Sequence, residues 1–234
     1  DLPIAKGREL GVSWLIQSIL FVHMVFRRRF SARCFSRVEA SVDDFTTESL
    51  FGKFRFIHEH LPGFLRPKLR RDKYLHLEGP TGGRLTGEGT TRGLARGRRC
   101  TVLFGDEYAH IEPPIQRRIQ ASSESVAASR ILVSTPNGPG DHFAEMAHGA
   151  KQHPNLFRMS WRDDPRKSEE WAAKKRDELG KELFDQEYGG EVTSRTSGLI
   201  WICSKAEVRY NDDGFNTSLR QTNPIVGGWD FGSG

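Results

Sequence analysis

Hydrophobic and polar positions in the first part of the chain follow the spacing of helices and strands in turn. A short apolar stub, 2–5, is followed by polar residues and then by 14–26, which predicts a mostly buried helix. The segment 30–38 alternates like a strand. The segment 42–60 carries apolar residues at helical spacing, and Pro62 with Gly63 ends it.

The rest of the chain continues this alternation. The pattern predicts strands at 73–77, 101–104, 130–134, 157–161 and 224–229, and helices at 113–122 and 168–188. Ser168 is expected to be the N-cap of the last helix. The glycine-rich stretch before 101 predicts a loop. Strands that alternate with helices favour an α/β fold with a mostly parallel sheet flanked by helices.

Positive charge is concentrated in one window. Residues 66–99 contain ten Lys or Arg and three acids, a local charge of +7, whereas the whole chain of 234 residues carries +5. Seven of the 24 glycines lie in the same window. A basic, glycine-rich segment in a near-neutral chain is a candidate for contact with phosphate or nucleic acid. A solvated loop whose arginines contact only water has the same composition, so charge alone leaves both interpretations open.

The composition argues against a membrane or secreted protein. No run reaches the ~18 consecutive apolar residues that a membrane span needs, and three arginines follow 14–26, on the wrong side for a secretory signal. The three cysteines, Cys34, Cys100 and Cys203, are widely spaced, which favours a reducing compartment over a disulfide scaffold. We expect Cys34 and Cys100 to pack as small apolar side chains.

The first candidate for chemistry is a variant phosphate-binding loop near the N-terminus. Its residues, which we predict to bind ATP, are Lys6, Gly7, Arg8, Glu9, Leu10, Gly11, Val12 and Ser13. The usual loop reads GxxxxGK[ST]. Here Gly11 and Ser13 keep their places, but Val12 replaces the lysine and Lys6 replaces the first glycine. Lys6 could reach the phosphates from the other end of the loop, although an ordinary strand–turn–helix junction would have a similar sequence.

The second candidate is an apolar strand, 101–105, that ends in adjacent carboxylates, Asp106 and Glu107. In a P-loop ATPase, the first acid would hold Mg²⁺ together with Ser13, and the second would activate the attacking water. The carboxyl ends of parallel strands meet at the ligand-binding edge of an open α/β sheet. An Asp-Glu pair also opens many surface turns. The order of the two motifs, about ninety residues apart, favours nucleotide hydrolysis.

The next predicted strand ends in Ser134-Thr135-Pro136-Asn137-Gly138. The polar side chains of Ser134, Thr135 and Asn137 could sense the γ-phosphate and pass its loss to neighbouring segments. Taken alone, the same residues suit a simple Pro-Asn-Gly turn.

Together these motifs resemble the large terminase subunit of tailed bacteriophages, the ATP-driven motor that packages DNA into procapsids. Further segments that resemble the family in order are FSRVEASVDD, LARGRRCTVLFGDE, LFDQEYGGEV and NPIVGGWDFG. The KGRELGVS loop resembles the family's variant in which the lysine moves to the front. STPNG resembles its coupling motif. The resemblance implies a P-loop (ASCE-type) ATPase with a small helical lid subdomain.

The resemblance also implies a domain organisation. Residues 1–192 would form the ATPase domain, with the lid at roughly 140–192. Residues 193–223 would be a linker, and 224–234 the first strand of an RNase H-like nuclease domain. Asp230 would be one ligand of an incomplete nuclease metal site, so we expect no nuclease activity from this chain. The family's N-terminal adenine-contacting segment has no counterpart here.

Catalysis in this family resembles a shared reaction between subunits. Arg96, in the step Leu94-Ala95-Arg96-Gly97, resembles an arginine finger that acts in trans. Arg92 is the nearest rival, and Arg8 could serve as an internal finger. The implied cofactors are ATP and Mg²⁺. The implied partners are double-stranded DNA, the portal protein, the small terminase subunit and further copies of the chain in a ring, with a monomer as the alternative in isolation. The implied location is the host bacterial cytoplasm, docked transiently on the procapsid.

Two other functions remain open on the sequence. A helicase or remodelling ATPase would share the fold, but arginine-rich helicase motifs are not evident after STPNG. A non-catalytic nucleotide-binding scaffold would explain the valine at position 12. An ATPase assay separates the scaffold from the two enzymes.

Overall fold

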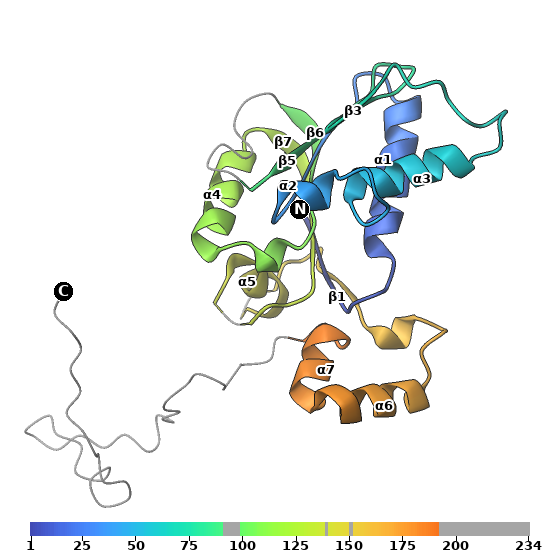
Figure 1. Ribbon diagram of the computed structural model, residues 1–234. Coiled ribbons are helices and arrows are strands. Elements are labelled where there is room, and N and C mark those ends of the chain that lie inside the picture. The colour runs from blue at the N-terminus through green and yellow to red at the C-terminus, as the bar shows by residue number, and fades with distance from the viewer. Residues whose placement is uncertain (91–98, 139, 150–151, 192–234) are drawn as a thin grey trace, which may run out of the picture. The chain divides into compact units, whose positions relative to one another are not determined.

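Eight strands form one sheet in the part of the chain that the computed structural model describes, residues 1–90, 99–138, 140–149 and 152–191. The strands are β1 (Leu2–Lys6), β2 (Ser31–Ser36), β3 (Arg71–Lys73), β4 (His76–Glu78), β5 (Arg84–Gly89), β6 (Cys100–Gly105), β7 (Ala127–Ser134) and β8 (Phe157–Met159). Their order in the sheet is β3-β4-β5-β2-β6-β7-β1-β8 (Figure 1). From β5 to β8 all neighbours are parallel, whereas β3 and β4 add an antiparallel edge. The prediction of a mostly parallel α/β sheet is confirmed.

Helices cover both faces of the sheet. They are α1 (Val12–Phe26), α2 (Glu39–Val42), α3 (Leu50–His60), α4 (Pro113–Ser123), α5 (His142–His148), α6 (Glu169–Leu179) and α7 (Lys181–Glu187), with short 3₁₀ turns η1 (Tyr108–His110) and η2 (Trp161–Asp163). Helices α1 and α3 lie on one side of the sheet in Figure 1, and α4 and α5 lie on the other. The sheet is therefore the middle layer.

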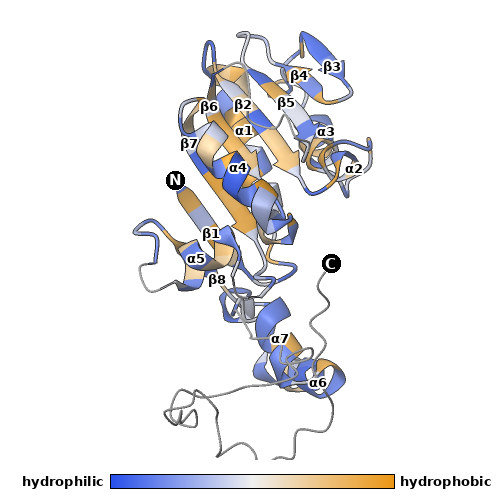
Figure 2. Cartoon of the chain, turned by 90° about the vertical axis from the view of Figure 1, so that its left-hand side faces the viewer, coloured by the Kyte–Doolittle hydropathy of each residue, from blue (hydrophilic) through white to orange (hydrophobic). Residues whose placement is uncertain are grey.

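Successive strand residues enter different cores because side chains alternate across a strand. Cys34 and Phe104 pack with α1 and α3, whereas Phe35 and Leu103 pack with α4 and α5. A third, smaller cluster joins Trp161, Ala172 and Phe184 of η2, α6 and α7. Figure 2 shows hydrophobic colour along the central strands and hydrophilic colour on much of the helical surface. Both-face burial explains the apolar runs at 101–104 and 130–134.

The strand order decides which chain segments meet at the ligand-binding edge. Strand β7 lies between β1, which leads into the variant loop, and β6, which leads into Asp106. All three strands are parallel, so their carboxyl ends lie at one edge. This insertion of a strand between the two motif-bearing strands is the arrangement expected of an ASCE-type P-loop domain.

The predicted helix at 42–60 is wrong as a single element. Helix α2 ends at Val42, and α3 begins at Leu50 after the N-cap Ser49, whose side chain accepts a hydrogen bond from the Gly52 amide. Between them, the Asp44 carboxylate accepts from the Thr46 amide at 2.8 Å. Short polar side chains that bond to nearby backbone compete with a helix, and the apolar spacing does not reveal this competition.

The glycine-rich stretch also contains structure that the sequence pattern did not predict. Residues 71–78 form the β3–β4 hairpin, and 84–89 form β5. A Cβ on Gly87 would lie 2.6 Å from Leu75 Cδ2 and 2.7 Å from Val42 Cγ1, so this strand position needs a glycine for close packing. The apolar stub 2–5 is likewise a full strand, β1, because its neighbours β7 and β8 pair with it.

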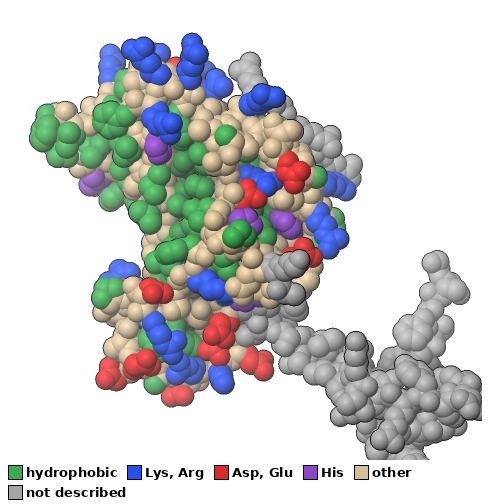
Figure 3. Space-filling view, turned by 180° about the vertical axis from the view of Figure 1, so that it is seen from behind, with side chains coloured by type: hydrophobic (Ala, Val, Ile, Leu, Met, Phe, Trp, Pro, Cys, Tyr) green, Lys and Arg blue, Asp and Glu red, His purple; other side chains and the backbone are tan. Residues whose placement is uncertain are grey.

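Helix α1 is only half-buried, contrary to the prediction. Val12, Ile16, Leu20 and Met24 face the core, but a second apolar row is exposed. That row, with its exposed fractions, is Leu15 57%, Ile19 41%, Val22 50% and Phe26 73%. Figure 3 shows hydrophobic side chains gathered on the rear of the molecule, the side from which α1 is seen. An apolar composition on all sides of a helix does not reveal which side the protein covers.

The C-terminal helices differ from the prediction in two places. Helix α5 was not predicted; Asp141 caps it by accepting from the Ala144 amide at 2.7 Å. The predicted helix at 168–188 is divided by Gly180, whose φ of 78° ends α6. Ser168 is the N-cap of α6, as predicted, and accepts from the Trp171 amide. Since Phe143 and Met146 of α5 belong to the main core, the separate cluster of η2, α6 and α7 marks the part that would serve as a lid.

The two described cysteines, Cys34 and Cys100, are free and buried, as predicted. Burial raises the pKa of the Cys34 thiol to about 12, so it packs as a neutral, apolar group. None of the helices that the structure describes is long and apolar enough to cross a membrane.

Candidate nucleotide site

Ser13 and Asp106 come together at the carboxyl edge of the sheet. Ser13 is in the first turn of α1, and Asp106 directly follows β6. The Ser13 Oγ donates a hydrogen bond to Asp106 Oδ2 at 2.7 Å, across 93 residues of sequence. A hydroxyl and a carboxylate are ligand types that Mg²⁺ takes, and octahedral coordination at ~2.1 Å places neighbouring ligand oxygens about 3 Å apart. The donor set therefore fits a magnesium ion.

Glu107 adopts a backbone conformation that is unusual for a residue with a side chain. Its φ is 54° and its ψ is 34°, the left-handed region, and its amide donates to Asp106 Oδ1 at 3.1 Å. Such conformations cost of order 1–3 kcal/mol and gather at functional sites. The turn leaves the Glu107 side chain exposed, next to the half-buried Asp106. An exposed carboxylate beside a metal-binding one is suitable for accepting a proton from water.

The variant loop is fixed at its start by the backbone of distant segments. The Gly7 amide donates to the Met159 carbonyl at 2.9 Å, and the Arg8 amide donates to the Glu187 carbonyl at 2.7 Å. A Cβ on Gly7 would lie 2.3 Å from the Tyr188 carbonyl oxygen, so no side chain fits there. The first amides of α1 have no acceptor within the helix, as at any helix N-terminus. They are available to phosphate oxygens.

The three side chains that compete for the phosphate-binding role differ in their surroundings. Val12 is 3% exposed and packs in the core with α1 and α3, so position 12 points away from any ligand. The Arg8 guanidinium forms an ion pair with Glu187 of α7. Lys6, the last residue of β1, is half-buried and makes no ion pair with the described residues. Of the two cations, Lys6 has the uncommitted ammonium.

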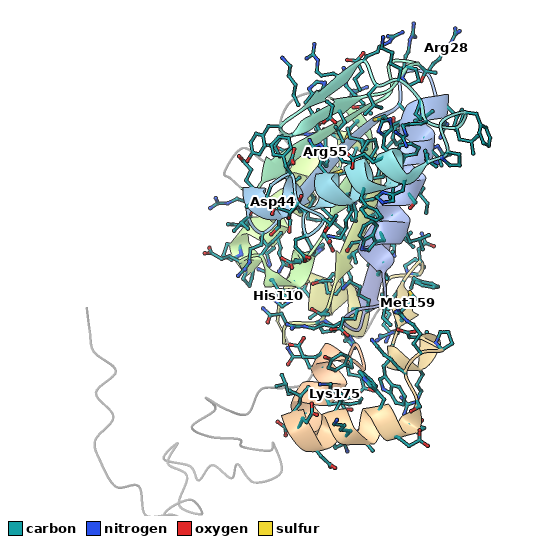
Figure 4. All side chains as sticks on the ribbon, turned by 45° about the vertical axis from the view of Figure 1, so that its right-hand side comes forward. Arg28, Asp44, Arg55, His110, Met159 and Lys175 are labelled. Atoms are coloured by element: carbon teal, nitrogen blue, oxygen red, sulfur yellow. The ribbon has the colours of Figure 1, made fainter. Side chains whose placement is uncertain are left out.

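The predicted coupling residues contact the turn that follows Glu107. Ser134 Oγ accepts from the Ala109 amide at 3.1 Å, and Thr135 Oγ1 lies 2.9 Å from His110 Nε2. Asn137 Nδ2 donates to the Ala109 carbonyl at 3.3 Å. His110, labelled in Figure 4, lies at the lower edge of the sheet layer, and its burial lowers its pKa. A shift of this turn would be felt at the end of β7.

Helix α7 contributes contacts that the sequence did not reveal. Gln186 is buried and donates from Nε2 to the Pro136 carbonyl at 3.2 Å, while Glu187 holds Arg8. Lys167, just before α6, donates to the Arg8 carbonyl at 3.1 Å. The segments that follow β1 and β7 are thus both attached to the α6–α7 cluster. Polar residues inside LFDQEYGG were the available signal, but their partners depend on tertiary packing.

Several predicted positions lie outside the described residues. These are Arg92 and Arg96, the linker 193–223, and Asp230 with the strand predicted around it. The predictions about an arginine finger and a nuclease metal ligand therefore remain predictions.

Comparison with solved structures shows the same fold in phage packaging proteins. The ATPase domain of the large terminase of Thermus phage P74-26 aligns with a TM-score of 0.61 and 20% identity, over 81% of this chain and 87% of that one. A large terminase from another thermophilic bacteriophage, solved in complex with ADP, aligns with a TM-score of 0.59 and 12% identity. That alignment covers 81% of this chain and 47% of the ADP-bound terminase, so the chain spans about half of that relative.

A second structure of that terminase, with ATP-γ-S, gives a TM-score of 0.60 at 12% identity, over 82% of this chain and 47% of that one. A comparison with curated proteins finds no match. A family model described as "Terminase large subunit, T4likevirus-type, N-terminal" matches residues 4–207, which include both halves of the candidate site. The chain therefore belongs to the family of phage large terminase subunits, in the part that corresponds to their ATPase domain.

Proposed function

We propose that this chain is the ATP-hydrolysing motor domain of a large terminase and that it moves double-stranded DNA into procapsids. The observation that carries the proposal is the Ser13–Asp106 hydrogen bond of 2.7 Å, with Glu107 next to it. The ADP and ATP-γ-S complexes of the thermophilic bacteriophage terminase support nucleotide binding by this fold.

The residues of the site divide the work of hydrolysis. Lys6 and the loop amides bind the phosphate oxygens, and Ser13 with Asp106 holds Mg²⁺, which supplies charge stabilisation when bound. Glu107 orients the attacking water and accepts its proton. The contacts of Ser134, Thr135 and Asn137 to the η1 turn would transmit the change at Glu107 to β7. Contacts of α7 to the Pro136 carbonyl and to Arg8 would carry it to the α6–α7 cluster.

DNA contact is proposed for the basic hairpin region. Its exposed cations are Arg66, Lys68, Arg70, Arg71 and Lys73. Figure 3 shows Lys and Arg side chains gathered at the upper end of the molecule, away from the α6–α7 end. Contacts should be directed to phosphates, because a motor must pass over any sequence.

Neutralising two of these cations should weaken DNA binding equally for unrelated sequences. The double variant Lys68→Gln with Arg71→Gln is expected to lower the slope of log K against log salt by about 2, one unit for each phosphate that is no longer neutralised. The measurement is fluorescence anisotropy on two duplexes of different sequence at several salt concentrations. Lys174→Gln with Lys181→Gln, exposed positions on α6 and α7, is the matched control. An unchanged slope would move the DNA surface elsewhere.

Hydrolysis is expected to require a neighbouring subunit. If Arg96 acts in trans, activity per subunit rises with protein concentration, since an arginine finger is worth ~10³–10⁵ in rate. Arg96→Ala subunits keep the carboxylates, and Glu107→Gln subunits keep the arginine. Mixing these two inactive proteins should restore part of the ATPase activity. Activity per subunit that is flat with concentration, together with an inactive mixture, would assign Arg96 to DNA or solvent contact.

The remaining proposals concern the assembled motor. A homo-oligomeric ring, docking on the portal protein, and recruitment by the small terminase subunit in the host cytoplasm are all properties that the family membership supports. A helicase-type ATPase would unwind DNA strands, and a scaffold would bind ATP without turnover. Strand-separation and ATPase assays on the purified chain distinguish these two alternatives from a packaging motor.

A further inference from the structure

A lysine of α3 lies beside the metal-binding end of the site. Lys53 is half-buried where α3 packs on the first turn of α1, and its Nζ is 5.9 Å from the ring centroid of Trp14. Trp14 directly follows Ser13 and also meets the Phe56 ring edge-on at 5.4 Å. The pairing of Trp14 with Lys53 and Phe56, one helical turn apart, fixes α3 against the residue next to the magnesium-binding serine.

The charges around Lys53 come from the site itself. The carboxylates that favour its charged form are, in decreasing order, Asp106, Glu48, Asp44 and Glu107. Burial acts in the opposite direction and lowers the pKa of Lys53. Asp106 and Glu107 are both members of the proposed site, so the ammonium lies within the field of the two carboxylates that would handle metal and water.

The ammonium is held in place by backbone and keeps donor capacity. Nζ donates to the Glu48 carbonyl and, at 3.5 Å, to the Ser49 carbonyl. An ammonium has three donors, so one remains for water or a ligand oxygen. By contrast, Arg55, two residues on and labelled in Figure 4, is engaged by Asp43 and Asp72. Arg55 therefore joins parts of the fold, whereas Lys53 borders the site.

We propose that Lys53 is a positioning residue of the nucleotide site, whose fixed positive charge balances Asp106 and Glu107 when no metal is bound. The proposal rests on the proposed ATPase function. Two adjacent carboxylates without a cation repel each other and favour protonation of one of them. Lys53 keeps both ionised and in place. Its charge also repels a divalent ion, so metal binds well only together with the negative phosphates of ATP.

The position also compensates for the missing lysine at residue 12. In the usual loop, that lysine adds a cation close to the metal-binding hydroxyl. Val12 is buried in the core and adds no charge. Lys53 supplies a cation to the same neighbourhood from another helix, and Lys6 remains free to bind phosphate.

The test is metal binding to the full chain without nucleotide, followed by turnover with ATP. Mn²⁺ affinity is measured by electron paramagnetic resonance for wild type, Lys53→Met, Lys53→Arg and Lys174→Met. Removing one charge near the site should tighten Mn²⁺ binding in Lys53→Met by about 3- to 30-fold, which corresponds to an effective dielectric between water and protein interior. Lys53→Arg should match wild type because it retains the charge. Lys174, exposed on α6, is the control.

In the turnover arm, Lys53→Met should lower kcat at saturating ATP and Mg²⁺ by about tenfold or more, and Lys53→Arg should recover most of it. Unchanged Mn²⁺ affinity in Lys53→Met would overturn the proposal. So would equal losses in the Met and Arg variants accompanied by lower thermal midpoints, which is the result of a purely structural role. The metal arm needs no hydrolysis. A wild-type chain that fails to turn over ATP therefore counts against the proposed function, and the Mn²⁺ affinities still decide the role of Lys53.

Discussion

Glu107→Gln is expected to retain ATP binding and to lose hydrolysis, whereas Asp106→Ala is expected to weaken binding of Mg²⁺-ATP itself. The two carboxylates are neighbours in sequence but differ in surroundings. Asp106 is half-buried and accepts the Ser13 hydroxyl at 2.7 Å, while Glu107 is exposed on a left-handed turn. A general base contributes typically 10²–10⁴-fold, so the Glu107 variant should lose at least that much turnover.

The measurements are binding of a fluorescent ATP analogue and steady-state phosphate release. Glu112→Gln provides a matched control, because Glu112 is an exposed glutamate five residues on, just before α4. It should change neither quantity. Equal and mild effects of the Asp106 and Glu107 substitutions would remove the assignment of the acidic pair.

Lys6→Ala is expected to reduce turnover by about 10²–10³, the range typical for loss of one group that stabilises developing charge. The structural reason is that position 12 cannot replace it. The Val12 side chain is 3% exposed within the core of α1 and α3. Adding Val12→Lys to the Lys6→Ala protein should therefore fail to restore activity. It would bury an ammonium in an apolar cluster.

Arg8→Ala is the comparison that could contradict this assignment. The Arg8 guanidinium is paired with Glu187, so its removal should affect turnover less than removal of Lys6. Phosphate release measured for both variants at saturating ATP decides the order. If Arg8→Ala were much more damaging, Arg8 would be the principal phosphate cation and the register of the loop would be wrong. Lys174→Ala controls for the loss of a surface lysine.

Motif chemistry was readable from the sequence because it is local. The loop 6–13, the pair Asp106-Glu107 and the segment 134–138 each require particular residue types within a few positions of a strand end. The rule that parallel strands carry ligands at their carboxyl edge then brings the three segments to one edge. The Ser13–Asp106 hydrogen bond is the structural result of that rule.

Element boundaries failed where two local effects compete. Apolar spacing over 42–60 is continuous, but capping side chains around Asp44 and Ser49 interrupt the helix. Glycines in 79–89 suggested a loop, yet Gly87 lies in a strand because Leu75 and Val42 leave no room for a side chain. Neither outcome can be read from hydrophobic periodicity.

By itself, then, the sequence determined the fold class, the catalytic pair and the variant loop, since periodicity and strand-end chemistry depend on neighbours in the chain. Only the tertiary structure decided the placement of β7 between β1 and β6, the hold of Glu187 on Arg8, and the position of Lys53 near Asp106. These relations join residues from about 50 to 180 positions apart. They depend on how helices pack across a sheet, which no local pattern encodes.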